Sequence, residues 1–205
     1  FKHPLSTGHH YPLDRGVGHY LNALMDASSM TGEPAYLVRA DQVIRGTVHP
    51  RDPVDQRGLL NAEAFWFYIV FLQSVARFLT EKEALGQIDS AFNYARASLL
   101  QYAFWMLEHE QPNLTNPEQL DFPNLTWAAQ DLRKAVVFYQ AYRFSPGLDE
   151  RYLEKAKFFR DYAVQEIAAD ETKELARIQT ILMQNQGVED FIATSHSWND
   201  YGPVD

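Results

Sequence analysis

The stretch TGEPAYLVRADQVI at 31–44 and the stretch GLDERYLEKAKFF at 147–159 repeat one short phrase. In each, a turn with Gly precedes Tyr-Leu, and an Ala stands three residues after the Leu. Gly is typical of a helix end because it adopts the left-handed backbone conformation without a Cβ clash. Tyr and Leu supply an apolar helix face, and a small Ala allows a close helix contact. The repeated phrase therefore predicts helical hairpins.

Hydrophobic spacing extends this prediction to most of the chain. Apolar residues recur at intervals of three and four, as they do on one face of a helix. The expected elements are a lead-in at 1–15, hairpins at 16–45, 59–109 and 126–168, a further helix at 171–184 and an irregular tail at 187–205. With 205 residues, the chain is long enough to bury one core. We predict an all-α fold in a single domain, 1–205.

Two long loops separate the expected hairpins. The loops at 46–58 and 110–124 are rich in Pro, which stops helices, and loops of this length often have a function. In antiparallel helix packing, the short turns lie at one end and the connections between hairpins at the other. We therefore expect the lead-in and both loops to share one face and to form a groove there.

The overall composition excludes several classes of partner. A formal net charge of −9 disfavours nucleic-acid backbones and anionic membrane surfaces, which would repel the average field of the protein. The longest apolar run, 62–72, contains Glu63 and is too short to span a bilayer. Cysteine is absent, so disulfides and thiolate chemistry are excluded. The chain begins at Phe1 without Met, from which we expect a piece of a longer protein.

The phrase TGEPAYLVRA resembles one found between the helices of α/α toroids, the fold of six-hairpin glycosidases and of the helical domains of heparinase-like polysaccharide lyases. GLDERYLEKA repeats it, and TEKEALGQIDSA is a degenerate third copy. The resemblance implies antiparallel hairpins in an incomplete α/α toroid or arc, because a complete ring has about six hairpins and this chain has room for three. It also implies a carbohydrate-related role and slightly favours a periplasmic or extracellular location.

The first candidate cluster lies in TGHHYPLDRGVGHY at 7–20. A lyase that acts on uronic acids needs a cation against the carboxylate, a base for the neighbouring proton and an acid for the leaving oxygen, and Arg, His and Tyr can supply these functions. The cluster comprises His10, Tyr11, Asp14, Arg15, His19 and Tyr20. In the alternative interpretation the histidines face solvent and Asp14 caps the first helix or forms a salt bridge with it.

The second cluster lies in the Pro-stiffened loop VHPRDPVDQRG and comprises His49, Arg51, Asp52, Asp55 and Arg57. Glu63 follows in an apolar helix, where a carboxylate costs stability unless it is paired, so it either faces a polar cavity or meets a partner. A general-acid role for Glu63 is one interpretation and a structural pair is the other. Similarly, PRDP could simply form a salt-bridged turn.

The third cluster offers Asp121, Asn124, Trp127 and Asp131. The ring of Trp127, with those of Trp66 and Tyr11, could stack on a sugar face. The alternative is that these aromatic residues belong to the core. The candidate catalytic residues are His10, Arg15, His19, Tyr20, His49, Arg51 and Glu63, and the candidate substrate-binding residues are Tyr11, Asp14, Asp52, Trp66, Asn124 and Trp127.

No metal or cofactor is predicted. The histidines lack the spacing of known metal motifs, and the Gly-x-Gly of RGVGHY has neither a preceding strand nor a third Gly. We expect a poly- or oligosaccharide, either neutral or acidic, as the partner of a lyase-like or glycosidase-like domain. The alternative is a non-catalytic helical-repeat module for interaction or scaffolding, and the apolar helix faces could also pair with a second copy or with missing parts of a parent chain.

Overall fold

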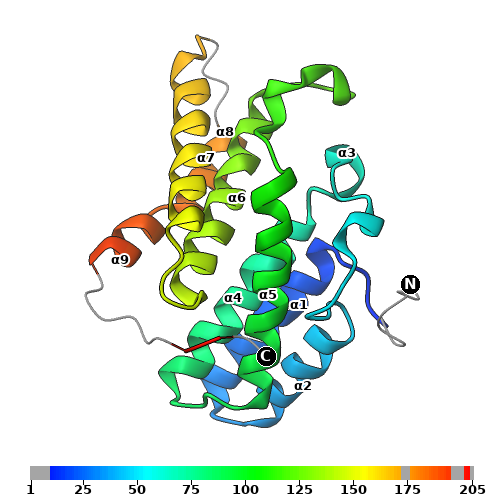
Figure 1. The fold of residues 1–205 in the computed structure, drawn as a ribbon, viewed down its shortest axis with the longest axis vertical. Coiled ribbons are helices and arrows are strands. Elements are labelled where there is room, and N and C mark those ends of the chain that lie inside the picture. The colour runs from blue at the N-terminus through cyan, green and yellow to red at the C-terminus, as the bar shows by residue number, and fades with distance from the viewer. Residues whose placement is uncertain (1–9, 172–175, 195–200, 204–205) are drawn as a thin grey trace. The chain divides into compact units, whose positions relative to one another are not determined.

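The computed structural model describes residues 10–171, 176–194 and 201–203, and every regular element among them is a helix (Figure 1). The α-helices are α1 (Arg15–Thr31), α2 (Ala35–Arg45), α3 (Ala62–Phe65), α4 (Tyr68–Ala84), α5 (Ser90–His109), α6 (Leu125–Phe144), α7 (Glu150–Ala169), α8 (Ala176–Asn185) and α9 (Val188–Thr194), and the 3₁₀ helices are η1 (Val54–Arg57), η2 (Asn113–Thr115) and η3 (Pro117–Gln119). The predicted all-α class is confirmed. The described residues form two compact units.

Unit 1 contains the described part of 1–59, residues 67–105 and Pro203. In it α1 packs against both α2 and α4. Gly18 makes the second contact possible, since a Cβ at this position would lie 3.1 Å from the Cα of Phe71. Gly18, the second glycine of RGVGHY, is therefore a helix-packing residue. The core beneath is built from fully buried side chains that include Leu21, Ile44 and Phe78.

The repeated phrase has the local structure that its residues predict. Gly32 ends α1 with a φ of 72°, and Gly147 turns the chain before α7 with a φ of 62°. Ala40 and Ala156, which hold equivalent places in the two phrases, are both fully buried. Each phrase thus ends one helix and places a small residue in the core of the next.

Unit 2 contains residues 60–66 and the described part of 106–202. Its main contact is between α6 and α7, which lie side by side in Figure 1. Phe138 of α6 stacks on Phe159 of α7, with ring centroids 5.7 Å apart. On another face of α6, Ala129 forms a small apolar cluster with Ile178 and Ile181 of α8.

Two segments differ from the expected elements. The helix expected from residue 59 is divided into α3 and α4. Asn61 caps the short helix α3, and residues 60–66 belong to unit 2, whereas residues 67–105 belong to unit 1. The tail expected to be irregular contains α9, and residues 195–200 of that tail lie outside the described part. None of the helices in the described part combines the length and hydrophobicity needed to cross a bilayer.

Candidate functional site

The loop at 46–58 is fixed along one side of α5. Tyr94 donates from its hydroxyl to the carbonyl of Val48 over 2.9 Å, and Gln101 donates to the carbonyl of Asp52 over 3.0 Å. Further along the helix, Trp105 donates from its indole nitrogen to Asp55 over 2.6 Å. Successive turns of α5 thus hold successive residues of the loop.

A buried carboxylate completes this anchoring. Asp52 is only 1% exposed, and its Oδ2 atom accepts from the hydroxyl of Tyr102 at 2.6 Å and from the guanidinium of Arg57 at 2.9 Å. The backbone N–H of His49 donates to the same oxygen over 2.9 Å. Asp52 thus forms its ion pair with Arg57, which lies outside the PRDP turn, and not with Arg51 inside that turn. We call Asp52, Arg57 and Tyr102 the Asp52 cluster. Because Asp52 is buried, it supports the loop from below.

Tyr94 and Tyr102 of α5 act as hydrogen-bond donors at neutral pH. Burial raises the pKa of Tyr94 to about 12. Burial also raises the pKa of Tyr102 well above its ordinary value, and the nearby carboxylate of Asp52 adds to the effect. Both hydroxyls therefore stay protonated and keep the loop in place.

The end of the lead-in docks beside this loop. The backbone N–H of Tyr11 donates to the carbonyl of Gly46 over 3.1 Å, and a Cβ at Gly46 would lie 2.8 Å from the Tyr11 ring. Residue 46 must therefore lack a side chain for the ring to lie there. Within unit 1, the described end of the lead-in and the loop at 46–58 are neighbours, as the sequence predicts.

Arg39 of α2 projects between two tyrosines. It donates to the hydroxyl of Tyr11 over 2.7 Å, to the hydroxyl of Tyr20 over 3.4 Å and to Gln42 over 3.1 Å. No carboxylate among the described residues pairs with Arg39. Its charge is held in position by neutral groups.

A second set of basic and aromatic side chains continues from α2 to the loop. The guanidinium of Arg45 lies 4.1 Å from the ring centre of Tyr94, and His49 meets the same ring edge-on at 5.8 Å. The backbone N–H of Arg51 donates to Nδ1 of His49 over 3.0 Å. We call the combined set the arginine–tyrosine surface; its members are Tyr11, Tyr20, Arg39, Arg45, His49, Arg51 and Tyr94.

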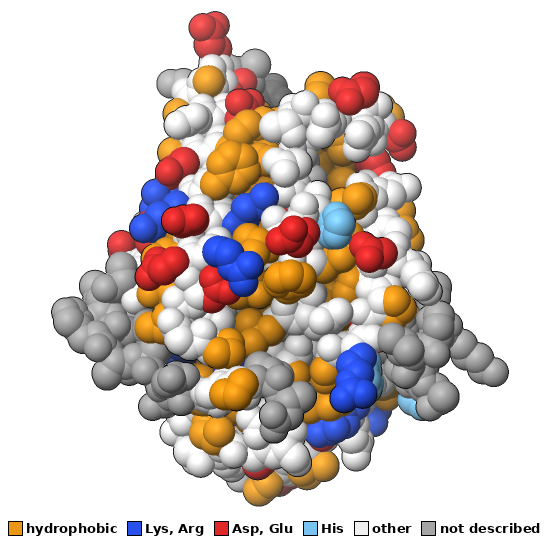
Figure 2. Space-filling model, viewed as in Figure 1, with side chains coloured by type: hydrophobic (Ala, Val, Ile, Leu, Met, Phe, Trp, Pro, Cys, Tyr) orange, Lys and Arg blue, Asp and Glu red, His pale blue; other side chains and the backbone are white. Residues whose placement is uncertain are grey.

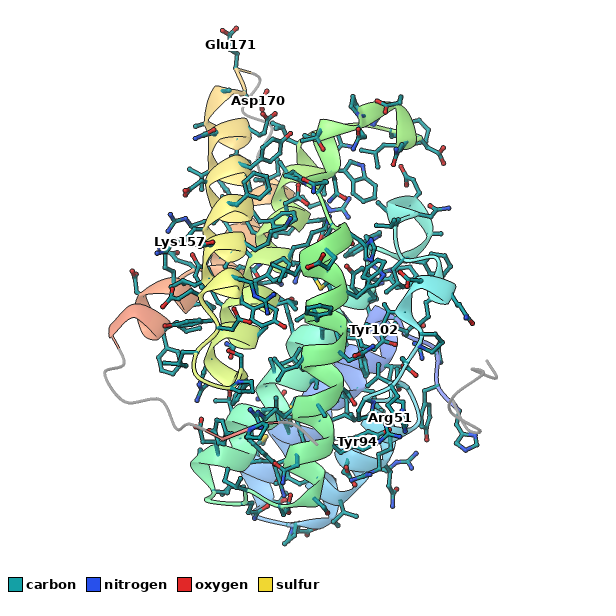
Figure 3. All side chains as sticks on the ribbon, viewed as in Figure 1. Arg51, Tyr94, Tyr102, Lys157, Asp170 and Glu171 are labelled. Atoms are coloured by element: carbon teal, nitrogen blue, oxygen red, sulfur yellow. The ribbon has the colours of Figure 1, made fainter. Side chains whose placement is uncertain are left out.

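The arginine–tyrosine surface is locally cationic on an acidic protein. Asp41 forms an ion pair with Arg45 at 2.9 Å. Arg51 is exposed and Arg39 is half-buried, and neither pairs with a carboxylate in the described part of the chain. Basic side chains gather in Figure 2 over the region where Figure 3 labels Arg51 and Tyr94. This region can attract an anion despite the net charge of −9.

The remaining candidates from the lead-in lie at the start of α1. Asp14 caps the helix, its Oδ1 atom accepting from the N–H of Val17 over 2.9 Å, as the alternative interpretation predicts. His10, Arg15 and His19 are exposed. Tyr20 contacts Arg39. The side chains of His10, Arg15 and His19 have no described contact.

The other candidates belong to unit 2. Glu63 is half-buried and accepts from the backbone N–H of Asp121 over 2.9 Å, so it has a structural partner. Asn124 caps α6. Trp127 is buried and donates to the carbonyl of Phe122 over 3.2 Å, which leaves little of its ring for a ligand. Trp66 is half-buried at the end of α3.

A buried charge cluster in unit 2 was not predicted. The ammonium group of Lys134 lies 2.7 Å from Glu110 and 3.2 Å from Asp131, and it donates to Asn113 over 3.1 Å. The backbone N–H of Asn113 in turn donates to Asp131 over 2.9 Å. We call Glu110, Asn113, Asp131 and Lys134 the Lys134 cluster. It ties the start of the loop at 110–124 to α6.

Two carboxylates share one ammonium group in the Lys134 cluster, and their pKa values reflect this. Burial raises the pKa of Asp131 to about 6, although Lys134 opposes the shift. Burial alone would lower the pKa of Lys134, but the charges of Glu110 and Asp131 outweigh it and raise that pKa. Lys134 therefore remains an ammonium ion at neutral pH. Each contact described for it is structural.

Sequence reasoning missed Arg39, Arg45 and Tyr94. Arg39 lies inside the repeated phrase and on the same helix as Arg45, so a count of cations on one segment would have drawn attention to both. Tyr94 becomes part of the surface only through its contacts with residues almost fifty positions earlier, and no local pattern predicts these.

The described residues contain no group of three or more metal-ligating side chains. Comparison of the chain with protein-family models, with curated protein sequences and with solved structures finds no match. The arguments for function therefore come from the geometry of this chain.

Proposed function

We propose that the protein binds an acidic poly- or oligosaccharide at the arginine–tyrosine surface of unit 1. The main support is the presence of Arg39 and Arg51, two cations without a carboxylate partner in the described part of the chain, among tyrosine rings. A guanidinium group pairs with a carboxylate through two parallel hydrogen bonds, which suits the acid group of a uronic acid. Flat aromatic rings suit the apolar C–H face of a sugar.

Among the carbohydrate reactions, this surface suits elimination better than hydrolysis. A glycosidase needs two carboxyl groups roughly 5–10 Å apart. The carboxylates nearest to this surface are already engaged, because Asp41 pairs with Arg45 and Asp52 is buried beneath the loop. A lyase instead requires a cation, a base and an acid, and Arg, Tyr and His are present here.

In such an elimination we propose Tyr20, acting as its phenolate, as the base and His49 as the acid. The base takes the proton from the carbon beside the carboxylate, the bond from the neighbouring carbon to the leaving oxygen breaks, and a double bond forms between the two carbons. The leaving oxygen then takes a proton from the acid. Nδ1 of His49 accepts from Arg51, so the neutral ring carries its proton on Nε2 and can donate it.

The incomplete toroid remains part of this proposal. The two copies of the repeated phrase at α2 and α7, together with the α1–α2 and α6–α7 contacts, support a hairpin repeat. An experimental structure of the chain would test the arrangement, and hairpins that do not curve around a common axis would contradict it. The periplasmic or extracellular location stays a prediction.

The proposal is tested by binding. We would measure the affinity of the protein for oligogalacturonates, for a sulfated polysaccharide and for a neutral glucan by calorimetry, and we would follow unsaturated products by absorbance. Arg51→Gln should weaken binding of the oligogalacturonate about tenfold, the worth of one charge-assisted pair. The matched control is Arg151→Gln, which removes an exposed arginine of α7 in unit 2.

The outcomes separate the competing interpretations. Weaker binding in Arg51→Gln alone supports the sugar site, and unsaturated products support the elimination reaction as well. If wild-type protein binds none of the three polysaccharides, the proposal fails and the interaction or scaffolding module becomes the better interpretation. Equal affinities of Arg51→Gln and wild type would move the site away from this surface.

A further inference from the structure

The arginine–tyrosine surface holds its two unpaired cations on separate supports. Arg51 lies in the loop at 46–58, next to His49. Arg39 lies on α2, a different element from the one that holds Arg51. A guanidinium group pairs with one carboxylate through two parallel hydrogen bonds, so each of the two arginines can bind a carboxylate of its own.

Arg39 is already oriented before any ligand arrives. Its guanidinium has five N–H donors, and the contacts with Tyr11, Tyr20 and Gln42 use one donor each. The other donors have no described partner. Neutral acceptors fix the group without cancelling its charge, which is what a site for an anion requires.

Tyr11 is the part of this arrangement that comes from outside the hairpin. Its ring lies 5.8 Å from the guanidinium carbon of Arg39 and against Gly46, and its backbone N–H donates to the carbonyl of Gly46. The ring is thus held at two points, and its hydroxyl meets Arg39 at 2.7 Å. Without that hydroxyl, the guanidinium would keep only the longer contacts with Tyr20 and Gln42.

We infer that Arg39 forms a second anion subsite, that Tyr11 positions it, and that the ligand carries several carboxylates along one chain. This inference rests on the proposed function and names its substrate class, a polymer of repeating acidic sugars rather than a single acidic sugar. Each ligand that spans both subsites gains a second ion pair in an intramolecular step. Affinity therefore rises with chain length until the ligand reaches both arginines.

The experiment measures affinity across a size series of oligogalacturonates, from the disaccharide to the octasaccharide. Wild-type protein should bind the long oligosaccharides at least about tenfold more tightly than the short ones. Arg39→Gln should remove most of this gain, so that its affinities for the disaccharide and for the octasaccharide become similar. Tyr11→Phe, which keeps the ring on Gly46 and removes only the hydroxyl, should reduce the gain in part.

Control variants and a second readout separate a binding role from a structural one. Arg151→Gln should keep the full dependence on chain length, and the thermal denaturation of Tyr11→Phe should match that of wild type to within a few degrees. If wild type binds the oligosaccharides but Arg39→Gln retains the gain with length, the second subsite is wrong while the proposed function stands. If wild type binds none of them, both fail.

Discussion

The two long loops are each tied to a helix by a buried charge, but the charges differ in sign and in balance. In unit 1 a carboxylate, Asp52, is buried under the loop at 46–58 and is matched by one guanidinium, that of Arg57. In unit 2 an ammonium group, that of Lys134, faces two carboxylates.

This difference has a consequence for pH. In the Asp52 cluster one carboxylate faces one guanidinium group. The Lys134 cluster has one more negative charge than positive charge, and the pKa of Asp131 rises to about 6 as a result of burial that Lys134 offsets only in part. The comparison teaches that the same structural task, anchoring a Pro-rich loop, is performed by one ion pair in unit 1 and by a pH-sensitive cluster with two carboxylates in unit 2.

The largest expected effect is that of removing the ammonium group of unit 2. Lys134→Met removes the ammonium group that contacts the buried carboxylates of Glu110 and Asp131, and it should lower the free energy of unfolding by about 3–5 kcal/mol. Urea denaturation would measure the loss, and hydrogen exchange should show faster exchange at 110–115 but not at 46–58. Lys157→Met, which removes an exposed lysine of α7, is the control and should leave both unchanged. A stable Lys134→Met protein would show that the cluster does not anchor the loop.

The reciprocal change in unit 1 is Asp52→Asn. It keeps the shape of the side chain but removes the buried carboxylate that pairs with the guanidinium of Arg57, so we expect a loss of about 2–3 kcal/mol. Faster hydrogen exchange should now appear at 46–58 and not at 110–115. Asp41→Asn, which breaks a surface pair with Arg45, should have a much smaller effect. Equal effects of the two substitutions would contradict the buried role of Asp52.

A pH titration tests the imbalance itself. Because the folded pKa of Asp131 is about 6 and the unfolded value is about 3.9, the folded state holds this proton more tightly. The contribution of Asp131 to the free energy of unfolding is therefore greatest below about pH 4 and is lost as the pH rises through 6, by at most about 3 kcal/mol.

The variant Asp131→Asn has no such titration, so the difference between wild type and this variant isolates the group. Wild type should lose stability relative to the variant between pH 4 and pH 7 in chemical denaturation, a range of about three units around the shifted pKa. A flat difference over this range would mean that Lys134 fully compensates Asp131.

The smallest expected effect concerns the outer end of the loop in unit 1. Tyr94→Phe removes the hydrogen bond to the carbonyl of Val48 and should cost about 1 kcal/mol, since a typical intramolecular hydrogen bond contributes about that much. The ring that contacts Arg45 and His49 is kept. Hydrogen exchange near Val48 should rise while exchange near Asp55 stays the same; a change along the whole loop would mean that its anchors act as one unit.

The sequence predicts well those features that depend on neighbours a few residues away. The helical class follows from apolar periodicity, and the helix end at Gly32 follows from its backbone freedom. The cap at Asp14 joins residues three positions apart and was one of two stated interpretations. The interruption between α3 and α4 was missed, because periodicity continues through residues 62–72 while the chain passes from one unit to the other.

For the candidate site, the sequence by itself determined which segments hold basic, aromatic and acidic groups, and it named Tyr11, Tyr20, His49 and Arg51. Only the tertiary structure decided their roles. It buried Asp52 and Trp127, placed Arg39 against a tyrosine 28 positions away, and brought Glu110 to Lys134. The physical reason is range: caps, turns and helix faces are fixed by local backbone geometry, whereas burial and charge pairing depend on which distant side chains the packed helices bring together.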